Sequence, residues 1–149
     1  MLIRYNVPQV FYPGSDKTEN AMVLRVLVDT LVRMNLVHLR CEKRRGRTVP
    51  LLYKSGVYYD RTLWWEPIPA LYGRGFGDCK SLSAALIAEK QFYDGVIAIP
   101  TFRWVENLDG SVDYHILVQV GSEFEDPSKV LGMGADENRR FYGAASVAY

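Results

Sequence analysis

The sequence lacks the features that define membrane-spanning and disulfide-rich proteins. Its apolar runs stop short of the ~18 residues that a membrane-spanning helix needs. Its two cysteines, Cys41 and Cys79, are too few for a disulfide framework, and both thiols would stay free in a reducing compartment. The opening MLIRYNVPQVF has neither the long apolar core nor the cleavage site of a signal peptide. We therefore expect a cytoplasmic protein without membrane contact, or one carried within a larger protein particle.

Excess charge and metal-ligand spacing are absent as well. The 18 Lys and Arg residues balance the 17 Asp and Glu residues, so net charge gives no reason to expect binding to nucleic acid. The basic run RCEKRRGR, from Arg40 to Arg47, has no interleaved aromatic residue and is expected to be a solvated loop. Nucleic-acid binding through it ranks last among the function classes. His38 and Cys41 form one local pair without a second at zinc-like spacing, so we expect neither a metal nor another cofactor.

The 149 residues suit a single domain, 1–149, with a sizeable core. Aromatic residues make up 13% of the chain, which indicates that some line a groove or an interface. Apolar residues at helical spacing predict a helix over 20–37, begun by Asp16 and Glu19. Next come a predicted hairpin over 49–61 and an irregular stretch over 64–77, where prolines and glycines interrupt any regular element.

The second half of the chain predicts a buried helix followed by an antiparallel meander. Asp78 is a good N-cap, and Cys79 would be the first residue of a helix that is apolar on nearly every side over 82–88. Strands are expected over 96–106, 112–120 and 123–127, with Pro100 at an edge or a bulge. Beyond Lys129 the tail shows no clear period. The fold class is therefore α+β, with a central helix that carries Cys79 packed on an antiparallel sheet.

Cys79 is the first candidate for chemistry. A helix N-terminus favours negative charge, so it favours the reactive thiolate, and its oriented N–H groups suit a developing oxyanion. The glycines before the cysteine let a substrate backbone approach closely. The alternative is a small hydrophobic residue packed at a helix start, because free cysteine is among the most buried residue types.

His115 is the candidate base and acid. In VDYHILVQV the apolar residues alternate with Asp113, His115, Leu117 and Gln119, which share the other face. A central helix lying across that second face would bring Cys79 to His115, where an imidazole takes the thiol proton and later protonates a leaving amine. A structural histidine is the alternative.

Asp126 is placed by strand arithmetic. If Gly121 and Ser122 form a two-residue hairpin loop, Val120 pairs with Glu123, and Asp126 lies diagonal to His115 on the same face. A carboxylate there would orient the imidazole and support its positive form. A register shift of one residue would put it on the wrong face. The alternative is a solvent-facing residue before the proline of DPS.

The same segments resemble the transglutaminase-like superfamily, a branch of the papain-like cysteine enzymes. GFGDCKSLSAALIAE resembles its nucleophile helix, DYHILVQV its histidine strand and EFEDPS its aspartate strand, over Gly75 to Ser128. The residues that follow Cys79 and His115 (Lys80, Ile116 and Leu117) depart from the family's usual choices. The resemblance implies a papain-like core in which Cys79 attacks an amide carbonyl to form a thioester. Water or an amine then resolves this acyl-enzyme.

Four further residues are candidates for contacts with substrate or oxyanion. The resemblance places an upstream aromatic or amide near the oxyanion, so Trp64 and Trp65 are candidate indole donors. A packing corner or a partner surface is the alternative for WWEP. Gln9 is a candidate amide donor if the N-terminal segment folds over the site, and Tyr72 is a candidate for the groove border.

Two functions from different classes follow. The first is a small transglutaminase-like cysteine hydrolase, a peptidase acting on a peptide or protein through a Cys79–His115–Asp126 triad. The second is a structural or adaptor component of a larger, for example viral, particle, which uses the same fold with a relict triad. An open groove with an accessible Cys79 would favour the enzyme, and a buried, inaccessible thiol would favour the scaffold.

Overall fold

The computed structural model describes residues 14–142 and 146–148 as an α+β chain, which confirms the predicted class. Its helical elements are α1 (Lys17–Arg44), α2 (Ile68–Arg74), α3 (Cys79–Glu89), α4 (Pro127–Val130) and α5 (Ala135–Tyr142), with a 3₁₀ turn η1 (Leu52–Lys54) and a π-helical turn η2 (Lys90–Asp94). Its strands are β1 (Tyr58–Tyr59), β2 (Phe76–Gly77), β3 (Ala98–Glu106), β4 (Val112–Val120), β5 (Glu123–Glu125) and β6 (Ser146–Ala148).

The main sheet is antiparallel, with the strand order β5-β4-β3-β6. The predicted meander of three strands is therefore confirmed. So is the predicted register, because Val120 pairs with Glu123 across the tight turn at Gly121. Gly121 has a φ of +59°, a left-handed conformation that suits a two-residue hairpin. β4 lies in the middle of the meander, between β5 and β3.

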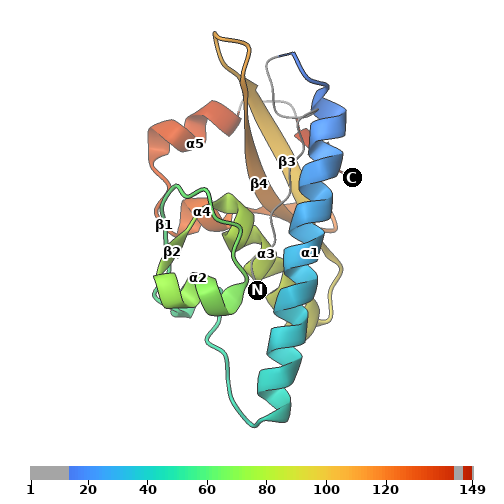
Figure 1. Ribbon diagram of the computed structural model, residues 1–149, viewed down its shortest axis with the longest axis vertical. Coiled ribbons are helices and arrows are strands. Elements are labelled where there is room, and N and C mark those ends of the chain that lie inside the picture. The colour runs from blue at the N-terminus through green and yellow to red at the C-terminus, as the bar shows by residue number, and fades with distance from the viewer. Residues whose placement is uncertain (1–13, 143–145, 149) are drawn as a thin grey trace.

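The two faces of the β3–β4 hairpin are covered by different helices (Figure 1). Phe102, Ile116 and Val118 belong to one apolar cluster with residues of α1 and α3, and each is almost fully buried. Leu82, at the centre of α3, is buried in the same cluster, as its all-round apolar sequence predicts. On the opposite face α5 places Phe141 against His115. Helices therefore cover both faces of the hairpin, and His115 on the second face is shielded from water.

The N-terminal half differs from the sequence-based expectations in three places. The first helix runs over Lys17–Arg44 and so includes most of the basic run that was expected to be a loop. Long unbranched side chains are good helix formers, and this helix ends only before Gly46, where φ is +69°. The predicted hairpin over 49–61 does not form. Instead, β1 pairs in parallel with β2, which follows it by 18 residues.

The third difference is α2, which occupies part of the stretch expected to be irregular. Pro67 precedes the first helical residue and Pro69 lies in the first turn, where a missing N–H costs nothing. Gly75 ends the helix in the left-handed conformation, with φ +86°. The prolines and glycines therefore delimit a short helix. Pro100 lies within an unbroken β3–β4 register, and β6 pairs only with Thr101–Arg103, so the proline occupies an unpaired edge rather than a bulge in the described sheet.

Gly77 allows β2 to lie directly against α2. A methyl group at Gly77 would stand 2.5 Å from Leu71 Cδ1, which is fully buried. We expect Gly77→Ala to lower the free energy of unfolding by about 1–3 kcal/mol through overpacking. Gly73→Ala is the matched control, since a methyl group there meets no atom within 4 Å and replaces glycine in a helix. Urea denaturation checks both, and a Gly77→Ala protein as stable as Gly73→Ala would contradict the packing argument.

Candidate active site

Cys79 is the first residue of α3, as predicted, and its thiol is half-buried. Asp78 is the N-cap, and its side chain accepts a hydrogen bond from Lys80 N at 3.2 Å. The sulfur therefore lies where the first backbone N–H groups of a helix have no helical partner. Both the partial positive charge and the free donors at this position suit a nucleophile whose reaction develops negative charge.

His115 and Asp126 form a buried hydrogen-bonded pair. His115 Nε2 lies 2.9 Å from Asp126 Oδ2, and only 2% of His115 is exposed. The contact follows from the predicted register, which sets Asp126 one residue beyond β5 and diagonal to His115. The other carboxylate oxygen, Oδ1, accepts from Lys129 N at 3.2 Å and caps α4. Asp126 thus holds the imidazole with one oxygen and starts a helix with the other.

The imidazole of His115 is held in its charged form. Burial acts to lower its pKa, but hydrogen bonds with Asp126 and with Cys79, and the negative charge of both partners, outweigh burial and raise the pKa of His115 to about 9. At neutral pH the ring is therefore an imidazolium between a carboxylate and a sulfur. Because Nε2 faces Asp126, Nδ1 is the ring nitrogen left for a second partner.

A cavity of about 370 Å³ brings the thiol and the imidazole to one surface. Its polar and charged lining comprises Tyr59, Arg61, Thr62, Asp78, Cys79, Asp113, Tyr114, His115 and Glu137, and its apolar lining comprises Leu63, Met133 and Phe141. Asp113, Tyr114 and His115 are consecutive, so the cavity follows the edge of β4 rather than one face. This edge is accessible because β5 pairs only with Val118–Val120 in the described sheet.

This edge location corrects one expectation. The central helix does not lie across the His115 face: its apolar residues cluster with Ile116 and Val118, and Ser83 Oγ donates to Ile116 O at 2.9 Å. Cys79 instead meets His115 around the edge of β4, at the N-terminal end of α3. The sequence pattern assigned His115 to the correct face but could not show which helix covers that face.

The other predicted substrate residues do not gather at this cavity. Trp64 is 55% exposed, with the Arg74 guanidinium 6.0 Å from its ring centre, and Trp65 packs on the core below Lys80. Tyr72 donates to Glu89 Oε1 at 3.2 Å, and burial raises the pKa of its phenol, which is a structural environment. None of these three side chains is among the cavity-lining residues. Gln9 lies outside the described residues.

Lys80, one of the departures from the family pattern, fixes one wall of the cavity. Its Nζ contacts Asp78 Oδ2 and donates to Thr62 O at 2.7 Å. Thr62 lines the cavity, so this ammonium ties the loop after β1 to the start of α3. The ring of Trp65 lies 5.8 Å from the same ammonium. Lys80 therefore positions the loop beside Cys79 without lining the cavity itself.

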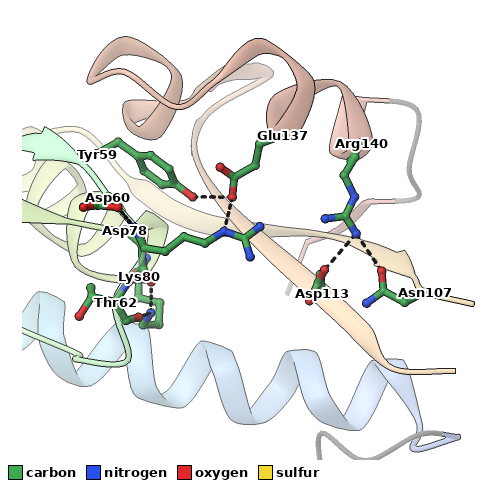
Figure 2. Close-up of polar contacts among 10 residues, drawn as sticks. Tyr59, Asp60, Thr62, Asp78, Lys80, Asn107, Asp113, Glu137 and Arg140 are labelled. Atoms are coloured by element: carbon green, nitrogen blue, oxygen red, sulfur yellow. Dashed lines mark hydrogen bonds and ion pairs between the residues drawn. The ribbon is translucent and has the colours of Figure 1, made fainter. Parts of the chain in front are cut away.

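The opposite wall is built by α5, which sequence reasoning missed. Figure 2 shows Glu137 reaching Tyr59, and Arg140 reaching Asp113 and Asn107. The ring of Phe141 stacks on His115 with 5.1 Å between ring centres. The acidic start and basic end of 135–142 were a signal for a short helix, but nothing local indicated where such a polar helix would dock.

Comparisons with known proteins gave no family assignment. No family model, curated protein or solved structure matched the chain significantly. Within residues 14–142 and 146–148, no group of three or more His, Cys, Asp or Glu side chains is arranged to hold a metal ion. In the same ranges, no helix is both long and apolar enough to cross a membrane.

Proposed function

We propose that this chain is a small cysteine peptidase of the transglutaminase-like type, with a papain-like core. In this proposal Cys79 is the nucleophile, His115 the proton carrier and Asp126 the residue that orients the imidazole. The observation that carries it is the buried His115–Asp126 pair at 2.9 Å, with Cys79 lining the same cavity as the imidazole. The substrate class is a peptide or protein amide. Support comes from the order of the elements, a cysteine-led helix followed by antiparallel strands that carry the histidine and aspartate.

The geometry supports a reaction in two halves. In the first, the Cys79 thiolate attacks the amide carbonyl, a C–S bond forms, and the oxyanion lies near the N–H groups at the start of α3. His115 gives its proton to the leaving nitrogen as the C–N bond breaks, which leaves a thioester and a neutral imidazole. In the second, that imidazole takes a proton from water, the water oxygen attacks the thioester, and the acid and the thiolate are released. Asp126 stabilises the imidazolium that is present before and after each cycle.

A scaffold role in a larger particle is the second candidate. The observation that favours it is the cover over His115, because Phe141 stacks on the ring and little of the imidazole reaches solvent. In that case Asp126 serves chiefly as the N-cap of α4 and Asp78 as that of α3.

Alkylation of the two thiols separates the candidates. Cys79 lies at a helix N-terminus and lines the same cavity as His115, whereas Cys41 lies near the end of α1, so we expect iodoacetamide at pH 6 to label Cys79 more than about tenfold faster than Cys41. Cys79→Ala should abolish the fast phase and all turnover of a peptide-amide library, and the matched Cys41→Ala should keep both. Equal labelling rates for the two thiols, or turnover that survives Cys79→Ala, would overturn the peptidase proposal.

A further inference from the structure

Arg61 is a cationic lining residue whose chemistry the proposed reaction does not use. It lies two residues after β1 and lines the same cavity as Cys79 and His115. Its Nε donates to Glu137 Oε1 at 2.6 Å. The hydroxyl of Tyr59 donates to the same oxygen at 2.9 Å, as the contact drawn in Figure 2 shows. Glu137 therefore fixes the guanidinium by its Nε edge.

The terminal edge of the same guanidinium remains available. Among the described residues, the two Nη groups of Arg61 have no hydrogen-bond partner, and 64% of the side chain is exposed. A guanidinium held by Nε presents its Nη groups as a fixed planar fork, which matches the two oxygens of a carboxylate.

The acidic residues of the cavity lining are already neutralised by cations of the protein. Asp78 pairs with Lys80, Asp113 pairs with Arg140 at 3.0 Å, and Glu137 pairs with Arg61 itself. The positive charge of His115 is matched by Asp126. Arg61 is thus the lining cation that still offers donors to a ligand, and the cavity has no unpaired acid to attract a cationic one.

Apolar groups surround this cation. Leu63 is almost fully exposed two residues along the same loop, and Met133 and Phe141 line the cavity with it. A ligand that fills the cavity would therefore place apolar atoms against these side chains and one anionic group at Arg61. A peptide with a carboxylate close to its reacting amide has this distribution of charge.

On the basis of the proposed function, we infer that Arg61 forms a carboxylate-binding subsite beside the nucleophile. It selects peptide amides that carry a carboxylate within a residue or so of the scissile bond. Two sources share this chemistry, an Asp or Glu side chain and a free C-terminal carboxylate, and matched substrates distinguish them.

The test compares peptide amides that differ in a single group. One pair has Glu or Gln next to the scissile bond, and the other has a free or an amidated C-terminus. We expect the protein to prefer the acid of at least one pair by about 10- to 100-fold in kcat/KM, mainly through KM, because a charge-assisted hydrogen bond is lost with the neutral partner. Arg61→Gln should equalise the pair, and Arg61→Lys should keep a reduced preference. Arg74→Gln, which removes an arginine paired with Glu66 away from the cavity, should retain it in full.

Binding to the Cys79→Ala protein separates this inference from the reaction. Calorimetric titration with the same peptides should show tighter binding of the acid, and Arg61→Gln in that background should remove the difference. Turnover without any preference, or a preference that survives Arg61→Gln, overturns the subsite and leaves the peptidase proposal intact. An Arg61-dependent preference in binding without turnover by the intact protein supports the subsite and overturns the peptidase. Equal affinities for acid and neutral peptides overturn the subsite whether or not turnover occurs.

Discussion

Asparagine in place of Asp126 is expected to slow turnover by about 10³- to 10⁴-fold while the protein stays folded. Asparagine retains a side-chain oxygen that can accept from Lys129 N, so α4 keeps its cap. What it loses is the negative charge 2.9 Å from His115 Nε2. An amide can neither stabilise the imidazolium nor specify the tautomer that the reaction needs, so both halves of the reaction suffer.

Two measurements check this outcome. Steady-state kinetics give the loss in kcat, and NMR titration should show the pKa of His115 well below its value of about 9, because burial then acts against less opposing charge. Asp16→Asn is the matched control, since Asp16 caps α1 by accepting from Glu19 N and lies in another element. A folded Asp126→Asn protein that keeps more than a tenth of wild-type turnover would show that Asp126 does not support the reaction.

The second large effect concerns the stability of the fold at Glu89. This residue ends α3 almost fully buried, where its Oε1 accepts from Leu52 N at 2.5 Å and from the Tyr72 hydroxyl. Burial raises the pKa of Glu89 from 4.5 to about 7, although these hydrogen bonds act in the opposite direction. A glutamine there provides the same acceptor without a charge to bury. We expect Glu89→Gln to raise the free energy of unfolding by about 2 kcal/mol at pH 8 and to change it little at pH 4.

The sign follows from proton uptake. Because the folded state holds the Glu89 proton more tightly than the unfolded state, stability falls as pH rises from about 4.5 to about 7. His115 affects stability in a separate pH range. Its raised pKa adds to the free energy of unfolding below about pH 6.5, and this contribution is lost as pH rises towards 9. Denaturation of Glu89→Gln across this range should therefore lack the acidic slope and retain the upper one. An unchanged slope between pH 4.5 and 7 would contradict the assignment to Glu89.

The parts of the fold that sequence predicted are those set by neighbouring residues. The N-cap at Asp78 places Cys79 at a helix start, and the two-residue turn after Val120 sets the register that brings Asp126 to His115. Both signals act over a few residues, where steric and hydrogen-bonding preferences leave little choice. The candidate triad could therefore be proposed before any coordinates were known.

The missed parts depend on contacts between distant segments. β1 consists of two residues and pairs with β2, so the turn residues 54–56 wrongly favoured a local hairpin over 49–61. α5 has only Asn138 and Phe141 buried, which leaves too weak an apolar pattern to show where it docks. The contact between Arg61 and Glu137 spans 76 residues. Local signals were thus enough to predict the candidate triad, whereas the residues that form the walls of the cavity could not be predicted from them.

The two aspartates that flank the proposed chemistry, Asp78 and Asp126, each begin a helix. A descendant of this chain that had abandoned catalysis would still need a side-chain oxygen at both positions to cap α3 and α4, which aspartate or asparagine provides. The sulfur of Cys79 caps no helix, and alanine or serine at this position would lower the free energy of unfolding only slightly. Loss of the activity would therefore be followed first by substitution of the cysteine. Retention of the two aspartates alone would not show that the activity is retained.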